Sequence, residues 1–249
     1  MPTDAADALR VANEAARTLQ EIRARHERGE IDADEARREG DQLANEVILA
    51  ALERTHPKDA VLSEEAKDDM TRLEAPRVWI VDPLDGTREF GEPPRTDWAV
   101  HVALVEQHQV VAAAVALPGM GLAFSTDPAP PPPPPMPGPP RVVVSRTRPP
   151  RLAGSVAEAL HGELVEMGSA GAKTLAVVRG VVDIYIHDGG QYEWDSAAPS
   201  AIAEAAGCHV SRLNGAPLRY NRRNPWLPDV LVCRPELAER ALAAVAAAR

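Results

Sequence analysis

Asp82 and Asp85 lie three residues apart in the segment Trp-Ile-Val-Asp-Pro-Leu-Asp-Gly-Thr (79–87), where an apolar run ends. Magnesium is a hard cation that binds carboxylate and carbonyl oxygens, and it keeps water ligands that a phosphate can replace. Because Pro83 bends the chain between the two acids, both carboxylates and the carbonyl of Leu84 are able to face one point. The segment therefore predicts a magnesium site.

The two residues that follow suit a phosphate ligand. Gly86 allows a phosphate to approach the backbone amides closely, and Thr87 places a hydroxyl beside them. The alternative is an ordinary turn, since Asp-Pro and Asp-Gly steps are common in turns and Thr87 is also a suitable helix cap.

Two other segments carry acids at positions that suit the same site. Glu64 lies in Leu-Ser-Glu-Glu (62–65), directly after an apolar run, and Asp195 lies in Glu-Trp-Asp-Ser-Ala-Ala (193–198), where a helix is expected to begin. The simpler alternative makes Asp195 a helix cap, with a contribution of about 1 kcal/mol. It leaves Glu64 as solvated charge, which is typical of acidic pairs.

The elements expected to position these acids in the first half of the chain are two helices and a sheet. Helical spacing predicts one amphipathic helix over 5–28 and, after a charged link at 29–34, a second one through 43–52 with Asp41 near its beginning. A buried strand at 78–81 is expected to stop at Asp82. The apolar runs 98–105, 110–117, 121–125 and 142–144 predict an antiparallel meander, the sheet of this half.

The second half shows alternating helical and strand patterns, which are typical of layered helices and sheets. Helices are predicted at 156–163, 172–179, 196–206 and 235–249, and strands at 164–167, 181–186 and 230–233. We therefore predict an α/β (α+β) fold with an N-terminal half over 1–140 and a C-terminal half over 141–249. The proline-dominated stretch 128–140 predicts an exposed, stiff loop between strands, in preference to a binding motif for a proline-reading partner.

Composition excludes several classes of protein. A net charge of −10 and a pI of about 5.2 argue against polymeric nucleic acid as a partner. The two cysteines, Cys208 and Cys233, give no disulfide framework or zinc motif. The first residues lack the basic-then-apolar order of a secretory signal, and the apolar stretches fall short of the roughly 20 residues that span a bilayer. We therefore expect a cytoplasmic protein with no membrane partner.

Taken in order, the three acidic segments resemble the signatures of the inositol monophosphatase superfamily: an acidic pair, an Asp-Pro-Leu-Asp-Gly-Thr turn, and a Trp-Asp-x-Ala-Ala helix start. The resemblance covers roughly residues 41–207. With Gly-Ser-Ala-Gly-Ala-Lys at 168–173, the chain looks most similar to the CysQ-type branch of bacterial 3'(2'),5'-bisphosphate nucleotidases, and within it to actinobacterial members. The resemblance implies an inositol-monophosphatase-like layered αβαβα sandwich.

The resemblance also implies roles for single residues. Two or three Mg²⁺ ions would be held by Glu64, Asp82, the Leu84 carbonyl, Asp85 and Asp195. Thr87, assisted by Asp41, would orient and deprotonate the attacking water, and Glu64 would hold the activating ion. Groups near the sugar and phosphate would be Gly168, Ser169, Lys173 and Glu193, although Lys173 also fits a solvated helix face.

Ser145 begins the segment Ser-Arg-Thr-Arg (145–148), which follows a predicted strand. Arg146 or Arg148 is positioned there to meet a second phosphate. A plain surface location of these arginines is the alternative.

The activity implied by the resemblance is removal of the 3'-phosphate of adenosine 3',5'-bisphosphate, a by-product of sulfate assimilation, to give AMP. Hydrolysis of inositol monophosphate or fructose 1,6-bisphosphate is the alternative within the same chemistry. A catalytically silent metal-binding scaffold is the alternative of another class. Lithium sensitivity and a homodimer are further expectations from the resemblance.

The sequence departs from the family pattern in two places. Relatives often carry a lysine and a threonine shortly before the acid aligned with Asp41, whereas residues 34–40 contain neither. Nucleotidase relatives also tend to have an arginine where this chain has His187 and Asp188. These departures affect the loop that assists water activation and the recognition of a second phosphate or base.

Overall fold

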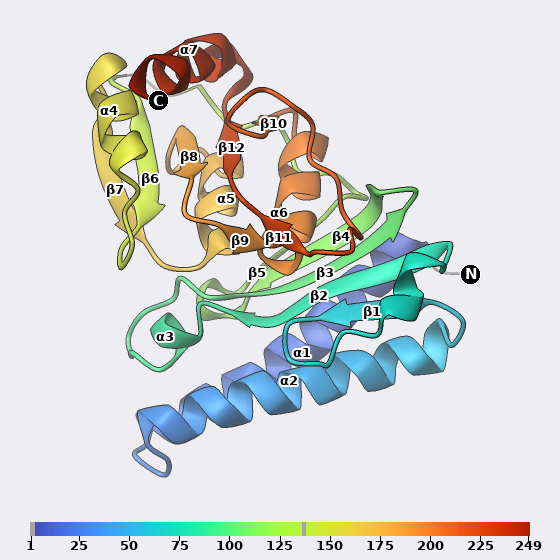
Figure 1. Cartoon of the computed structure of the whole chain (residues 1–249). Coiled ribbons are helices and arrows are strands. Elements are labelled where there is room, and N and C mark those ends of the chain that lie inside the picture. Colours follow the sequence, from blue (N-terminus) through green and yellow to red (C-terminus); the bar gives the residue numbers. More distant parts are fainter. Residues whose placement is uncertain (1–2, 136–137) are drawn as a thin grey trace.

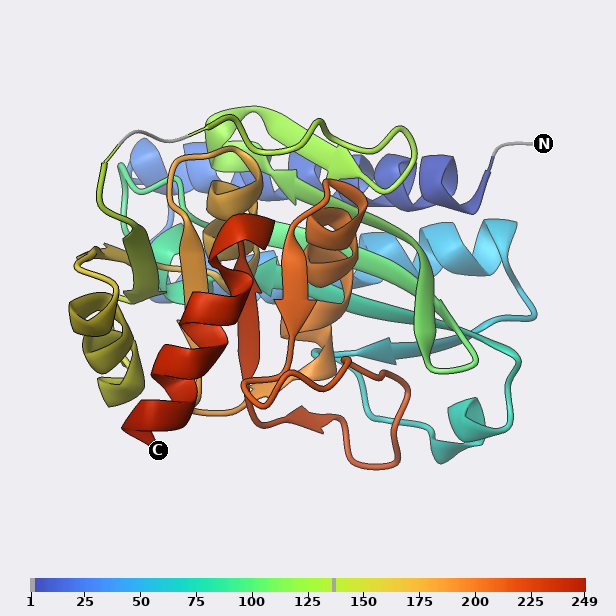
Figure 2. The same ribbon diagram turned by 90° about the horizontal axis from the view of Figure 1, so that it is seen from above.

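The computed structural model describes residues 3–135 and 138–249, which stack as five layers of helices and sheets (Figure 1). The first layer contains the long helices α1 (Asp4–Glu27) and α2 (Ala33–Thr55). Helices α5 (Ala170–Val178) and α6 (Glu193–Ala205) lie between two sheets, and α4 (Arg151–Ala159) and α7 (Ala238–Ala248) form the last layer. Figure 2 shows the same stacking from above, with α7 nearest the viewer. The predicted αβαβα sandwich is confirmed.

The first sheet has the strand order β1-β2-β3-β4-β5. Strand β1 runs parallel to β2, and the remaining neighbours are antiparallel. The strands are β1 (Ala60–Ser63), β2 (Arg77–Asp85), β3 (Ala99–Glu106), β4 (Gln109–Leu117) and β5 (Leu122–Ser125).

The second sheet has the order β10-β12-β8-β6-β7, in which β6 is parallel to both of its neighbours. Its strands are β6 (Arg141–Ser145), β7 (Glu163–Met167), β8 (Ile184–His187), β10 (His209–Ser211) and β12 (Val230–Cys233). A separate small ribbon pairs β9 (Gln191–Tyr192) with β11 (Trp226–Leu227). The short helices are α3 (Thr87–Phe90) and 3₁₀ turns at Met70–Leu73, Pro118–Met120 and Pro235–Leu237.

Alternation along the strands divides the interior into separate apolar clusters. In β2, Trp79 and Val81 pack toward α1 and α2, whereas Val78 and Ile80 pack toward α5 and α6. Strand β8 divides in the same way, because Tyr185 faces the central cluster while its neighbours face α4 and α7. The central strands of both sheets are thus buried on both faces, and helices α5 and α6 pack against strands of each half. None of the described helices is both long and apolar enough to cross a bilayer.

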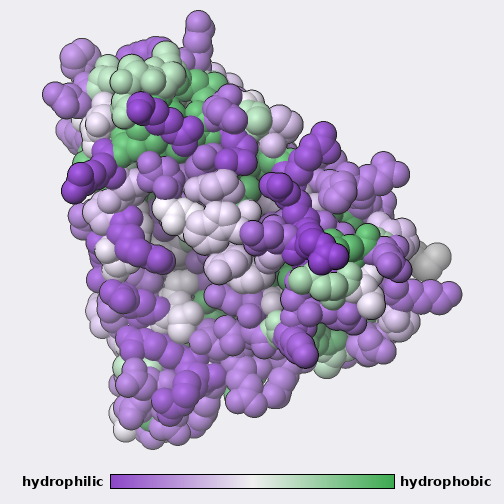
Figure 3. Space-filling view, viewed as in Figure 1, coloured by the Kyte–Doolittle hydropathy of each residue, from purple (hydrophilic) through white to green (hydrophobic). Residues whose placement is uncertain are grey.

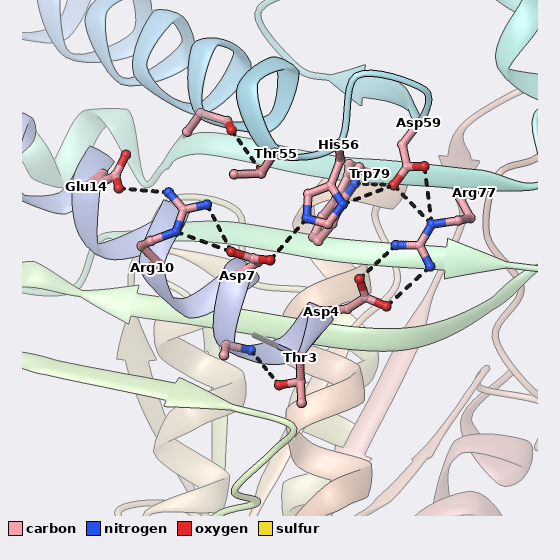
Figure 4. A network of polar contacts seen from close by, with 12 residues as sticks. Thr3, Asp4, Asp7, Arg10, Glu14, Thr55, His56, Asp59, Arg77 and Trp79 are labelled. Carbon is pink, nitrogen blue, oxygen red and sulfur yellow. Dashed lines mark hydrogen bonds and ion pairs between the residues drawn. The ribbon is translucent and has the colours of Figure 1, made fainter. Parts of the chain in front are cut away.

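A polar network ties the start of α1 to the end of α2 and to β2 (Figure 4). Arg77 forms ion pairs with Asp4 at 2.8 Å and with Asp59 at 3.1 Å. Asp59 also accepts a hydrogen bond of 2.9 Å from the indole nitrogen of Trp79. The network therefore anchors the start of α1 and the segment after α2 to strand β2 of the first sheet.

Strand β2 continues beyond the predicted stop at Asp82. Asp82 pairs with His101 and Asp85 pairs with Ala99, and the register shifts between these two pairs. Pro83 therefore lies within an irregular stretch of the strand and does not end it, because a bulge accommodates the missing amide donor.

Several other predicted boundaries are corrected by the structure. The run 142–144 is not part of the meander; it belongs to β6 of the second sheet, beside β7 and β8. The helix expected at 156–163 lies at 151–159, and the strand expected at 181–186 lies at 184–187. Helix α2 begins at Ala33, where Asp32 accepts a hydrogen bond of 2.8 Å from the Glu35 amide. Asp41 therefore lies more than two turns into this helix.

The described part of the proline-rich stretch is mostly exposed, but hydrogen bonds attach it to the second half, one of them from the Glu163 amide to the Pro140 carbonyl at 2.8 Å. The carbonyl of Pro134 accepts a hydrogen bond from the guanidinium of Arg234, which also pairs with Asp183 at 2.7 Å. Residues 136 and 137 of the predicted loop lie outside the described residues.

Candidate active site

Three carboxylates meet where the two halves of the chain adjoin. Asp82 and Asp85 come from the last part of β2, and Asp195 comes from the first turn of α6. One carboxylate oxygen from each lies within 4.8 Å of the others. Asp82 and Asp85 are buried, with 1% and 7% of their surface exposed. Strand and helix thus bring together acids that are far apart in the sequence.

Neighbouring donors already hold part of this cluster. Asp85 accepts hydrogen bonds from the Ser169 hydroxyl at 2.5 Å and from the amides of Ala170 and Gly171 at 3.1 and 2.7 Å. These amides open helix α5, whose N-terminal end favours negative charge. Burial alone would raise the pKa of Asp85, but the ion-pair contact with His101 and the charge of Lys173 hold it below its ordinary value.

Asp82 accepts fewer hydrogen bonds than Asp85. Its Oδ1 accepts a hydrogen bond of 3.1 Å from the Leu84 amide, but its buried Oδ2 has no hydrogen-bond partner among the described residues. Burial, followed by repulsion from Glu64 and Asp85, raises the pKa of Asp82 well above its ordinary value. Burial and the charge of Asp85 likewise raise the pKa of Asp195 to about 6.

A divalent cation fits this donor set. All three ligands are oxygens, one buried oxygen accepts no hydrogen bond from the described residues, and burial with mutual repulsion raises the pKa of two of the three acids. The residues present therefore suit Mg²⁺ or a similar hard cation, and the cluster is where it would bind.

Glu64 and Leu84 line the same cavity as the three carboxylates. Glu64 directly follows β1, and its amide donates to the Val81 carbonyl at 3.3 Å. Burial, followed by repulsion from Asp195 and Asp85, raises the pKa of Glu64 to about 8, although part of the side chain reaches solvent. Glu64 stands at the border of the cluster.

Thr87 and Asp41 form a hydrogen-bonded pair. The Thr87 hydroxyl lies 3.2 Å from Asp41 Oδ1 and 3.0 Å from the Leu84 carbonyl oxygen. The pair depends on the close approach of α2 to α3, where a Cβ on Gly40 would lie 2.9 Å from Leu84 and Phe90 atoms. Burial, together with repulsion from Glu65, raises the pKa of Asp41 to about 7. A carboxyl in this range can accept or release a proton near neutral pH.

A cavity of about 650 Å³ opens beside the cluster. Figure 3 shows this face of the molecule, with a recessed pale area framed by hydrophilic side chains. Residues from both halves line the cavity, and they include the predicted substrate groups Gly86, Thr87, Ser145, Gly168, Ser169 and Lys173. The structure therefore brings these predicted residues together at one opening.

Close packing at Gly86 and Gly168 shapes the cavity wall. Gly86 has a φ of 88°, a conformation that side chains with a Cβ rarely adopt. The Gly168 amide donates to Asp97 at 2.6 Å, and a Cβ there would lie 2.2 Å from Glu89. Neither position accommodates a side chain without displacing its neighbours.

Lys173 is not on a solvated helix face. Its side chain is 5% exposed, its ammonium donates to the Ser169 carbonyl at 2.7 Å, and it lies 5.4 Å from the centre of the Tyr185 ring. Burial lowers the pKa of Lys173. A buried cation that lines the cavity is well placed to attract an anionic ligand.

Glu193 departs from its predicted place. It is not among the residues that line the cavity, and its buried carboxylate accepts hydrogen bonds from the amides of Asn221 and Arg222 at 2.6 and 3.0 Å. Direct contact with a substrate is therefore not supported, and the observed contacts hold the segment at 221–222 against α6. Its neighbour Tyr192 faces the cavity instead.

His101 was not predicted from the sequence. It is fully buried, its Nε2 lies 3.3 Å from Asp85 and its Nδ1 lies 3.0 Å from the Trp194 carbonyl. Burial lowers its pKa, but the ion-pair contact with Asp85 outweighs this and the pKa is raised. The only sequence signal for His101 as a site residue was its position as the single polar residue in the apolar run 98–105. A histidine in such a run is more often a core residue than part of a site.

The two arginines of the segment 145–148 have different surroundings in the structure. Arg146 forms ion pairs of 2.8 Å with both Glu89 and Glu92, so its charge is already neutralised. Arg148 is exposed and lines the cavity, and its side chain forms no hydrogen bond or ion pair within the described ranges.

Comparison with known proteins places these features in context. The family model for the inositol monophosphatase family matches residues 4–127 and 142–249. The 3'-phosphoadenosine 5'-phosphate phosphatase of Mycobacterium tuberculosis is 51% identical over 215 residues, which cover 83% of this chain and 80% of the relative. The protein of the same name from Mycobacterium leprae is 48% identical over 251 residues, or 95% and 91% of the two chains.

A solved structure shows the same architecture. The crystal structure of CysQ from Bacteroides thetaiotaomicron, a bacterial member of the inositol monophosphatase family, superposes with a TM-score of 0.78 at 27% sequence identity. The superposition covers 93% of this chain and 97% of that one. The likeness therefore extends over the whole layered fold.

Proposed function

Because this chain belongs to the inositol monophosphatase family, as its motifs predicted, we propose that it is a magnesium-dependent phosphatase acting on adenosine 3',5'-bisphosphate. The products are AMP and inorganic phosphate. One structural observation carries the proposal: three clustered carboxylates, one with a buried oxygen that accepts no hydrogen bond from the described residues, border a cavity that a buried lysine also lines. The mycobacterial relatives, at 51% and 48% identity, support the choice of substrate.

Asp82, Asp85 and Asp195, with Glu64 and the Leu84 carbonyl beside them, would hold two or three Mg²⁺ ions. When bound, the metal supplies charge neutralisation for the phosphate and lowers the pKa of water. The Ser169 hydroxyl and the amides of α5 fix the orientation of Asp85, so that its carboxylate is in place before a cation arrives.

Thr87 and Asp41 would move the proton of the attacking water. Thr87 Oγ1 accepts that proton as it donates its own to Asp41 Oδ1, which lies 3.2 Å away. Asp41 suits this role because its pKa of about 7 lets the carboxyl hold a proton temporarily at neutral pH.

The two phosphates of the substrate would bind to different parts of the cavity. We assign the phosphate end to Gly86, Gly168, Ser169 and Lys173, and assign Ser145 to the wall beside it. Arg148, and not Arg146, would meet the second phosphate, because Arg146 is already paired with two glutamates. Recognition of two phosphates separates a nucleoside bisphosphate from inositol monophosphate.

A parallel assay tests the proposal. Adenosine 3',5'-bisphosphate, inositol 1-phosphate and fructose 1,6-bisphosphate are each incubated with the enzyme, with and without Mg²⁺, and kcat/KM is taken from released phosphate. A magnesium-dependent preference for the nucleotide supports the proposal. A preference for either other substrate would replace it, and no release from any would favour a silent scaffold.

The cytoplasm remains the proposed compartment. The buried free thiols of Cys208 and Cys233 support a reducing environment. A homodimer stays a prediction, which light scattering of the purified protein would check.

A further inference from the structure

Two exposed aromatic side chains border the cavity at its open end. Tyr192 and Trp226 are 42% and 41% exposed, and both line the cavity. The other large apolar side chains exposed within the described ranges do not line it, among them Met70, Val111, Leu122, Leu164 and Val181. Apolar exposure at the cavity is therefore confined to a pair of flat rings.

These rings are held in place by the small β9–β11 ribbon. Tyr192 and Trp226 are cross-strand partners, and their rings meet edge to face with centroids 5.6 Å apart. The other neighbour of Tyr192 is Trp194, stacked at 4.7 Å with an interplanar angle of 7°. The ribbon and the stack together fix the orientation of Tyr192 before any ligand binds.

Gly190 covers part of the Trp226 indole. A Cβ added to Gly190 would lie 1.9 Å from two ring carbons, so only glycine permits this contact, and its φ of 81° also favours glycine. The Gly190 carbonyl in turn lies 3.0 Å from His187 Nε2. The indole is packed on one side and remains open to the cavity elsewhere.

The aromatic pair is also linked to the acid cluster. The Tyr192 amide donates to Asp195 Oδ2 at 2.7 Å, so the residue that presents a ring also orients a predicted metal-binding carboxylate. A ligand that spans the cavity would therefore place a phosphate near Asp195 and a planar group near Tyr192 and Trp226.

We propose that Trp226 and Tyr192 form the wall that binds the nucleobase, with the base stacking on the open part of the Trp226 indole. The inference rests on the proposed function, because it assigns the base of the same substrate. Stacking suits this wall since every base presents a flat π face, whereas inositol and fructose phosphates have none. The wall would thus select nucleotides over other phosphate esters.

The first test is the change in selectivity of Trp226→Ala. We expect the ratio of kcat/KM for adenosine 3',5'-bisphosphate to that for inositol 1-phosphate to fall by about 10- to 100-fold, mainly through KM for the nucleotide. Trp226→Phe, which keeps a flat ring, should recover most of the ratio. Leu164→Ala removes an exposed apolar side chain away from the cavity and is the matched control. An equal loss for both substrates would overturn the inference.

A second test does not depend on turnover. AMP, titrated into the wild type, should quench tryptophan fluorescence through stacking on Trp226, and Trp226→Phe should lose this quenching. Ribose 5-phosphate, which lacks the base, should quench neither protein. If the wild type failed to hydrolyse adenosine 3',5'-bisphosphate but AMP still quenched Trp226, only the proposed function would fail. Absence of quenching in the wild type would reject the wall itself.

Discussion

Asp82 and Asp85 at the floor of the cavity are buried and accept hydrogen bonds from neighbouring groups, whereas Tyr192, Trp226 and Arg148 at its rim are exposed. Asp85 at the floor accepts three hydrogen bonds from α5 and the residue before it. Arg148 at the rim has a side chain without a hydrogen bond or ion pair in the described ranges. The difference indicates that the floor is fixed for metal chemistry and that the rim distinguishes ligands.

The largest effect is expected from Asp82→Asn, which removes a predicted metal ligand from the floor. Turnover should fall by about a thousandfold or more, because the substitution removes a charge needed to hold the metal. Initial rates at saturating Mg²⁺ measure this loss. In metal-free protein the same variant should unfold at an equal or higher temperature, because it removes a buried carboxyl whose charged form Glu64 and Asp85 repel. A mild change in turnover would contradict the role given to Asp82.

A smaller loss is expected when the floor keeps its metal ligands but cannot move a proton. Asp41→Asn should lower kcat by about a hundredfold with little change in KM, because general acid–base catalysis typically contributes that much. Gln42→Ala, at an exposed position on the same helix, is the control and should keep wild-type kcat. If Asp41→Asn raised KM and left kcat intact, Asp41 would be a binding residue.

Substitutions near the rim should affect substrate binding more than turnover, and the two arginines Arg146 and Arg148 should differ from each other. Arg148→Ala should raise KM for adenosine 3',5'-bisphosphate by about tenfold, the loss expected for one charge-assisted contact, while thermal stability stays unchanged. Arg146→Ala should instead lower the melting temperature, because it leaves the 5% exposed Glu89 without its partner. The opposite pattern would show that Arg146 binds the phosphate.

The smallest effect is on stability. Because a ligand that binds the folded state stabilises it by about 2.7 kcal/mol at a hundredfold excess over Kd, Mg²⁺ should raise the melting temperature by about 5 °C or more. Asp195→Asn should reduce this shift. Sodium chloride at equal ionic strength controls for general salt effects, and an equal shift with it would argue against a specific site.

The sequence predicted the floor better than the rim. Asp82, Asp85 and Asp195 lie in short segments whose local patterns place them at the end of a strand and the start of a helix. Only the family resemblance predicted that these segments form one site, because no local sequence pattern indicates that residues 85 and 195 lie close together. Tyr192 and Trp226 gave no comparable signal, because α6 and β10 lie between them in the sequence and their pairing exists only in the folded chain.

Errors in the fold have a related cause. The run 142–144 looked like a further strand of the meander, since an apolar strand pattern does not reveal its partner strand. Pro83 suggested a strand end from local propensity, whereas pairing of Asp82 and Asp85 with β3 carries the strand through it. His101 was missed because its importance depends on two acids of the neighbouring strand, and Glu193 was misplaced because its partners lie at 221–222.

The proline-rich connection has a consequence for how the halves join. The family model ends at residue 127 and resumes at 142, and the intervening chain links β5 of the first sheet to β6 of the second. Successive prolines leave this link few conformations in the unfolded chain, so little entropy is lost when Arg234 holds Pro134 in place. The connection is therefore ordered against the second sheet at low entropic cost.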